Sequence, residues 1–148
     1  LYNAIAFLAA LCLIPLSRRF GPRAVHAACL LASGVAMFAL PGIGNEAGLF
    51  VAMLGIGLGW ASMMGNPYLM LVDMIPPERS GVYMGIFNMF IVIPMMIESL
   101  TIPLFYDPLL GGDARMVIIL SGILMVAGAG ATLLVGRGKM RAAMTESA

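Results

Sequence analysis

The sequence predicts an all-α membrane protein with about five transmembrane helices. Hydrophobic residues make up 61% of the 148 residues and charged residues only 10%, whereas charged residues make up about 25% of an ordinary soluble domain. The mean hydropathy is +1.02. A soluble core of this size would leave much apolar surface in water, so we expect a lipid bilayer to cover that surface.

Apolar runs, separated by short stretches rich in charge, Gly and Pro, define the predicted spans. The runs cover about residues 1–16, 24–41, 47–72, 82–106 and 116–136. All but the first are long enough to cross about 30 Å of hydrocarbon. The first run starts at Leu1, with neither an initiator Met nor a basic leader. We therefore interpret it as the later part of a span, and the chain as a fragment that lacks its N-terminal part.

The distribution of positive charge predicts the orientation of these spans. Alternate loops and the tail hold Arg18, Arg19, Arg23, Arg79, Arg137, Lys139 and Arg141. The loops of the opposite side hold only Arg115. The positive-inside rule places the larger set in the cytoplasm. We expect a multi-pass protein of the cell membrane, whether inner or plasma membrane, with the tail 137–148 on the cytoplasmic side.

The stretch from Gly59 to Pro94 predicts a membrane hairpin with a polar seam. Two long apolar runs meet there at a polar hinge, Pro76 to Gly81. If both runs are helices that rise about 1.5 Å per residue, Asn66 and Asn88 lie at similar depths, about 10 Å inside the bilayer. An amide at that depth needs a partner or a wet cavity, because lipid offers it neither donor nor acceptor.

Further residues of this hairpin are candidates for contact with a substrate. Pro67 removes a backbone hydrogen bond, and the neighbouring Asn66 and Tyr68 can meet the freed groups or a ligand. Trp60 lies near mid-membrane, where its ring can pack against the apolar side of a sugar or against the protein core. Glu98 is the only carboxylate well inside a span. It is expected either to serve in proton coupling or to pair with the absent half of the protein.

Small residues and three other side chains have simpler interpretations. Gly55 and Gly59 form a small-xxx-small face that predicts close approach of another helix. Cys12 and Cys29 fall in apolar runs and are expected to be buried small hydrophobes. His26 follows the first basic loop and is expected to lie at the membrane interface, with a proton relay as the disfavoured alternative.

The sequence contains no His/Cys cluster with metal-ligand spacing, nucleophile motif, phosphate-binding loop or nucleic-acid-binding surface. We therefore expect no enzyme, no cofactor, no metal site and no nucleic-acid partner.

The first basic loop, Ser17 to Arg23, resembles the motif Asp-Arg-x-Gly-Arg-Arg/Lys of major facilitator superfamily transporters. Arg19, Gly21 and Arg23 match this pattern, while Arg18 stands where Asp is usual. A Gly at this position permits a tight turn, and the cations can hold helix C-termini in a cytoplasmic gating loop. A basic loop that only sets the topology is the alternative interpretation.

The hairpin is similar to one family in particular, the sucrose/maltose-type sugar:cation symporters of the same superfamily. The similarity rests on Trp60-Ala61-Ser62, on Pro67-Tyr68 and on the block from Gly81 to Pro94. It extends over nearly the whole chain, from the eighth of twelve helices to the C-terminus. It implies a partial C-terminal half of a twelve-helix major facilitator fold, with the missing N-terminal half as its partner.

The resemblance implies import of a disaccharide or related glycoside together with protons, by alternating access. Our predicted substrate-binding residues are Trp60, Asn66, Tyr68 and Asn88, with Glu98 as the candidate for proton coupling. Two other functions stay open: an exporter of lipophilic small molecules, and a non-transporting membrane receptor or scaffold with the same fold. A membrane-embedded enzyme is disfavoured because no span offers a convergent catalytic set.

The predicted orientation can be tested by cysteine labelling in sealed cells, in a background without Cys12 and Cys29. Glu46→Cys and Asp113→Cys should react with a membrane-impermeant thiol reagent added outside, because both positions lie in predicted outer loops. Arg79→Cys should stay unlabelled until the cells are opened. Labelling of Arg79→Cys alone would invert the orientation and contradict the charge-based prediction.

Overall fold

A computed structural model describes residues 2–72 and 74–135 of the chain. Within these residues it has no strand and five α-helices: α1 (Tyr2–Phe20), α2 (Pro22–Ala39), α3 (Glu46–Val72), α4 (Ser80–Leu110) and α5 (Ala114–Leu134). Short 3-10 turns, Leu40–Gly42 and Pro77–Arg79, precede α3 and α4. The all-α class is therefore confirmed for the described residues. Each α-helix also belongs to a segment long and apolar enough to cross a membrane. The predicted cytoplasmic tail 137–148 lies outside the described residues.

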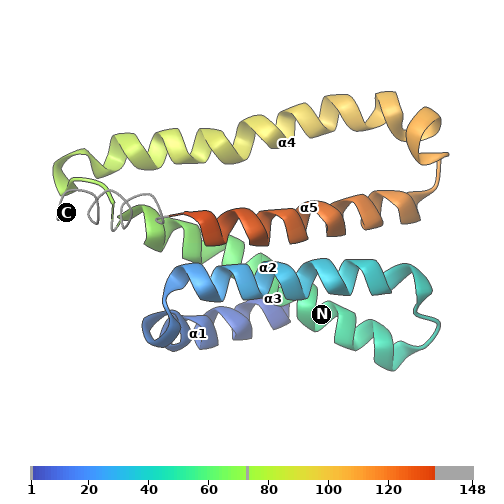
Figure 1. The fold of residues 1–148 in the computed structure, drawn as a ribbon, viewed down its shortest axis with the longest axis horizontal. Coiled ribbons are helices and arrows are strands. Elements are labelled where there is room, and N and C mark those ends of the chain that lie inside the picture. The colour runs from blue at the N-terminus through green and yellow to red at the C-terminus, as the bar shows by residue number, and fades with distance from the viewer. Residues whose placement is uncertain (1, 73, 136–148) are drawn as a thin grey trace, which may run out of the picture.

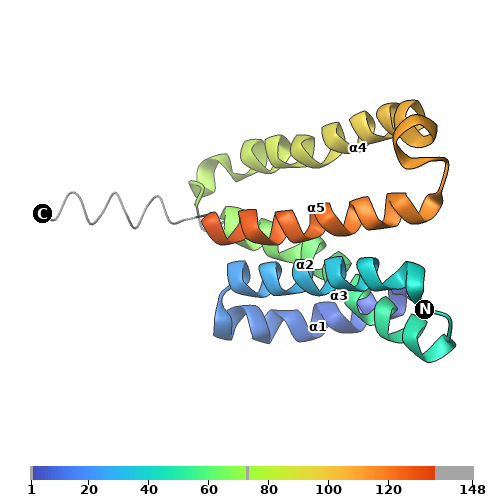
Figure 2. The ribbon, with the colours of Figure 1, turned by 45° about the vertical axis from the view of Figure 1, so that its right-hand side comes forward.

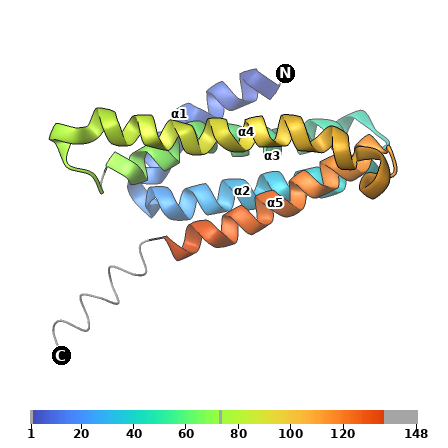
Figure 3. The same cartoon turned by 90° about the horizontal axis from the view of Figure 1, so that it is seen from above.

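Helix α2 lies at the centre of the packing. It contacts α3 on one side and α5 on another, and α1 packs mainly against α3. Figure 1 and Figure 3 both show α5 running beside α2, while α3 crosses α2 at an angle. Helix α4 lies beyond α5, at the outer edge (Figure 2). Helices α1, α2 and α3 share the buried apolar core, and α5 packs closely against α2.

Glycines allow α3 to approach both of its neighbours closely, as the small-xxx-small pattern predicts. A Cβ atom at Gly55 would lie 2.8 Å from the Cβ atom of Ala36 in α2. On another face of α3, a Cβ atom at Gly57 would lie 2.7 Å from the Cγ2 atom of Ile5 in α1. Both distances are shorter than real contacts allow, so the absence of side chains at these positions brings the helices together.

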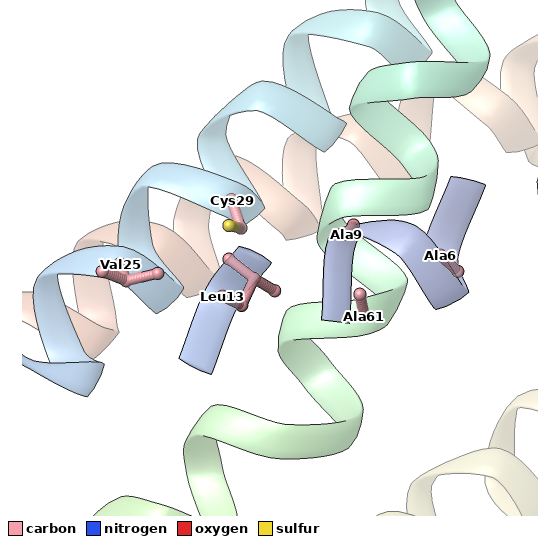
Figure 4. Packing of buried hydrophobic residues seen from close by; sticks show 6 residues of the cluster. All are labelled: Ala6, Ala9, Leu13, Val25, Cys29 and Ala61. Carbon is pink, nitrogen blue, oxygen red and sulfur yellow. The ribbon is translucent and has the colours of Figure 1, made fainter. Parts of the chain in front are cut away.

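The apolar core between α1, α2 and α3 consists of small and medium side chains (Figure 4). Its members are Ala6, Ala9, Leu13, Val25, Cys29 and Ala61. Cys29 is buried as expected. The same expectation for Cys12 is wrong, because Cys12 lies on the exposed side of α1. Hydrophobicity alone could not tell the two apart, since a membrane helix is apolar on both its lipid side and its packed side.

The first basic loop is shorter than predicted. Helix α1 continues through Arg19 to Phe20, and α2 begins at Pro22, so only Gly21 lies between them. Gly21 has φ of 84°, in the left-handed region that favours glycine, which confirms the predicted tight turn. Pro22 starts α2 without losing a helical hydrogen bond, because the first N–H of a helix has no partner within it.

The connection between α4 and α5 is also shorter than predicted. Helix α4 extends past residue 106 to Leu110, so only Gly111, Gly112 and Asp113 join it to α5. Gly111 and Gly112 both have positive φ, at 63° and 67°. The Asp113 carboxylate accepts a hydrogen bond of 2.8 Å from the Arg115 N–H and so caps the start of α5.

The glycine contacts predict a difference between two otherwise matched substitutions in α3. A Cβ atom at Gly59 would lie 2.5 Å from the Cβ atom of Ser33, whereas nothing lies within 4 Å of one at Gly65. Gly59→Ala should therefore lower the free energy of unfolding by about 1–3 kcal/mol. Gly65→Ala should leave it unchanged or raise it by up to about 1 kcal/mol, because Ala favours the helix.

Unfolding of the purified protein in detergent, by heat or by SDS titration, measures both variants against the wild type. Equal effects of the two substitutions would contradict the close approach of α2 and α3 at Gly59.

Candidate functional site

Four polar side chains form a continuous hydrogen-bonded chain between α1, α2 and α3. The Ser17 hydroxyl donates to the Asn66 Oδ1 atom over 2.8 Å. The Asn66 Nδ2 atom donates to the Ser62 Oγ atom, also over 2.8 Å. The same Ser62 Oγ atom lies 2.8 Å from the Nδ1 atom of His26. We call Ser17, Asn66, Ser62 and His26 the buried polar chain.

All members of the buried polar chain are shielded from the surroundings. Their exposed fractions are 5% for Ser17, 3% for Asn66, 0% for Ser62 and 7% for His26. Within the described part of the protein, no buried side-chain nitrogen or oxygen lacks a hydrogen-bond partner. Polar groups inside a membrane helix bundle are tolerated when they satisfy one another in this way, and they then hold the helices together.

The local sequence explains why these side chains meet. Ser62 and Asn66 are four residues apart and therefore lie on the same face of α3. Ser17 precedes Gly21 by four residues and His26 follows it by five, so the tight turn brings both to a similar height at the same end of the bundle. Neither position is distinctive in the sequence, and the prediction did not include Ser17, Ser62 or His26 in a site.

The expectation that His26 lies at the membrane interface is wrong in one respect. His26 is the fifth residue of α2, about 6 Å along the helix from its start. Its side chain is nevertheless buried, because it faces α3 instead of the lipid headgroups. Depth follows from sequence position, whereas the direction in which a side chain faces depends on helix packing.

Asn66 and Asn88, the two amides of the predicted seam, do not meet. Asn66 faces α1, while Asn88 is exposed on α4 and accepts a hydrogen bond of 2.7 Å from the Tyr68 hydroxyl. The Tyr68 ring also contacts Phe87 edge to face, with 4.9 Å between ring centroids and 72° between planes. Residues two apart on a helix differ by about 200° in direction. Asn66 and Tyr68 therefore serve opposite sides of α3, and we call Tyr68 and Asn88 the outer polar pair.

The remaining predicted substrate residues lie away from the buried polar chain. Trp60 is 43% exposed and, eight residues before Tyr68, lies on the same side of α3 as Tyr68. Glu98 is exposed on α4. None of the residues from Ser80 to Leu110 is buried, so Asn88 and Glu98 both stand on a helix with little packing.

The basic residues around the first turn are held in different ways. Arg23, in the first turn of α2, donates a hydrogen bond to the Val135 carbonyl at the C-terminal end of α5. This is the kind of contact predicted for cations of the gating loop, because helix C-termini carry unpaired carbonyl groups. The Arg19 guanidinium lies 5.4 Å from the centre of the Phe20 ring. These contacts place a positively charged patch at one end of the bundle.

A function cannot be assigned from a metal centre among the described side chains, nor from a match of the chain to a known protein. Among residues 2–72 and 74–135 no group of three or more His, Cys, Asp or Glu side chains could hold a metal ion. Comparison of the chain with protein-family models, with curated proteins and with solved structures finds no match. The function is therefore argued from the two polar clusters, one buried and one exposed.

Proposed function

We propose that these helices form one wall of a secondary active transporter that imports a disaccharide or related glycoside with protons by alternating access. The outer polar pair carries this proposal. Tyr68 and Asn88 belong to helices long enough to cross a membrane, and their hydrogen bond of 2.7 Å is exposed. Lipid cannot satisfy an exposed amide, so polar groups at membrane depth usually line a water-filled pathway.

The chemistry of the outer polar pair suits a sugar. An amide and a phenol together can accept and donate hydrogen bonds, as sugar hydroxyls also do. A sugar hydroxyl can replace Tyr68 as the partner of Asn88, with little change at either side chain. Trp60, on the same side of α3, supplies an aromatic ring of the kind that packs against the apolar face of a sugar ring.

The weak packing of α4 supports the proposal that this helix moves during transport. Helix α4 contains Pro94, Pro103 and Pro108, and none of its side chains is buried. Helices interrupted by proline and bearing polar groups commonly form the walls of transport pathways. By contrast, the buried polar chain and the glycine contacts fix α1, α2 and α3 to one another. We propose that further membrane helices, from the N-terminal half expected from the sequence, face α4 across the pathway.

Glu98 is the proposed proton-coupling carboxylate. It is exposed on α4, roughly in the middle of the helix. A carboxylate within a membrane span is costly unless it reaches water or a partner, so its position favours a functional role. The turn at Arg19, Gly21 and Arg23 would contribute a cytoplasmic gate, and the resemblance of this loop to the major facilitator motif supports that assignment.

A second function is favoured by a specific observation. An apolar groove of about 740 Å³ runs between α2 and α3 and is lined only by Ala, Leu, Val, Ile and Gly side chains. A groove of this kind accommodates lipophilic molecules, as an exporter of such solutes would need. Counterflow of a labelled disaccharide separates the two functions, because an exporter of lipophilic molecules would not exchange a labelled sugar.

Two variants of α4 test the proposed sugar pathway in the complete carrier, reconstituted in proteoliposomes. Asn88→Ala should weaken the apparent affinity in counterflow of a labelled disaccharide by about five- to thirtyfold, because a hydrogen bond to substrate worth about 1–2 kcal/mol is lost. Glu98→Gln should abolish accumulation driven by a proton gradient but leave sugar exchange intact. Ser99→Ala is the control, since this hydroxyl bonds only the Met95 carbonyl of its own helix.

The two activities distinguish a functional role of α4 from a structural one. Concentrative uptake with normal affinity in both variants would show that neither side chain belongs to the pathway. A parallel loss of exchange, accumulation and protein abundance in Glu98→Gln would assign Glu98 to structural pairing instead of proton coupling.

A further inference from the structure

His26 is the only histidine of the chain, and the proposed sugar pathway does not use it. It forms one end of the buried polar chain, where its Nδ1 atom lies 2.8 Å from the Ser62 Oγ atom. We infer that His26 is a proton-binding site, and that its protonation reverses the hydrogen bonds of the buried polar chain as far as Ser17. If His26 is taken to couple protons to sugar transport, the inference rests on the proposed function. The assignment of His26 as a proton-binding site does not.

The direction of the hydrogen bonds favours one state of the neutral ring. Asn66 accepts from Ser17 through Oδ1 and donates to Ser62 through Nδ2. The Ser62 Oγ atom therefore already accepts one hydrogen bond and has one hydrogen of its own to donate. Of its two side-chain partners in the buried polar chain, only the Nδ1 atom of His26 can accept that hydrogen. Neutral His26 then carries its proton on Nε2, with Nδ1 as the acceptor.

A second proton on the ring cannot be accommodated by this arrangement. Both nitrogens of an imidazolium ring are donors, so Nδ1–H must now donate to the Ser62 Oγ atom. Ser62 then donates its hydrogen to the next member, which requires the Asn66 amide to turn its Oδ1 atom toward Ser62. The Asn66 Nδ2 atom then faces Ser17 and donates to it. The bound proton stays on His26, and only the orientation of the hydrogen bonds changes along the buried polar chain.

The far end of the buried polar chain has room to respond. Ser17 and Asn66 line a groove of about 240 Å³ between α1 and α3. Ser17 also lines a second groove of about 430 Å³ together with Arg18 and Pro22. After reversal the Ser17 hydroxyl accepts from Asn66, and its own hydrogen can turn toward these grooves. Protonation at His26 in α2 is therefore communicated to α1 through α3.

The charges around His26 come from the same end of the bundle. Arg18 and Arg19 in α1 are exposed, and Arg23, three residues before His26 in α2, is engaged by the Val135 carbonyl of α5. The Cys29 thiol, one turn further along α2, also interacts with Ser62. On the remaining neighbours, Glu46 of α3 and Arg115 of α5 are exposed at helix starts.

The described neighbours offer no carboxylate near His26, so Ser62 meets the added positive charge through its hydroxyl and its backbone. A neutral residue is a weak counterpart for a buried cation, and the reorientation of the buried polar chain is a further adjustment to protonation.

Nitrogen NMR of the purified protein in detergent micelles, with ¹⁵N-labelled His and Asn, tests this inference without any solute. The single His26 ring should be in the Nε2–H tautomer at high pH and should gain a second proton as the pH is lowered. The Asn66 side-chain amide should shift with the same midpoint. Ser62→Ala should abolish the tautomer preference and uncouple Asn66 from His26. Ser121→Ala, whose hydroxyl bonds the Val117 carbonyl of its own helix, should behave as the wild type.

The alternatives give different spectra. A neutral Nδ1–H tautomer, a ring that stays neutral throughout the titration, or an Asn66 amide that stays unchanged during it would each overturn the inference. Where Ser62→Ala fails to fold, Ser17→Ala serves instead, because it should keep the His26 tautomer while shifting the Asn66 amide. A negative NMR result would overturn the proton site but would not bear on the sugar pathway. Conversely, if His26 and Asn66 titrate together but no sugar counterflow is seen, the sugar pathway is rejected and the proton site stands.

Discussion

The buried polar chain is the interaction on which the arrangement of α1, α2 and α3 depends. Apolar side chains give membrane helices little reason to prefer one another over lipid, so close packing and interhelical hydrogen bonds decide which faces meet. Here the glycines of α3 bring the backbones close enough for short side chains such as Ser17 and Ser62 to reach across. The hydrogen bonds then specify one rotation of each helix, because any other rotation would leave an amide or imidazole in hydrocarbon.

The protein therefore has a tightly packed part and a loosely packed part. Helices α1, α2 and α3 are joined by hydrogen bonds between side chains and by close backbone contact, and α5 approaches α2 closely where a Cβ atom at Gly34 would lie 3.0 Å from the Gly122 carbonyl oxygen. Helix α4 has no buried side chain and is linked to α3 through the outer polar pair. This contrast suits the proposed transporter, in which α4 would move while its support keeps its shape.

Run lengths and turn residues in the sequence were enough to predict the helices, the tight turn at Gly21 and the close approach at the glycines of α3. The rotation of each helix about its axis could not be predicted. Asn66 and Tyr68 are adjacent to the same proline, yet they serve opposite faces, and only packing decides which face is buried. The burial of the His26 side chain against α3 was missed for the same reason. The extension of α4 through Pro108 was missed because a proline near an exposed helix end costs few hydrogen bonds.

The most direct test compares the same substitution at the two amides, Asn66→Ala and Asn88→Ala. Reversible unfolding of the purified protein in mixed detergent micelles measures both. Asn66→Ala should lower the free energy of unfolding by about 1–3 kcal/mol, because Ser17 and Ser62 each lose a partner inside the bundle. Asn88→Ala should change it by less than about 0.5 kcal/mol, since that amide is exposed. Equal losses, or a larger loss at Asn88, would contradict the claim that the buried polar chain holds the helices together.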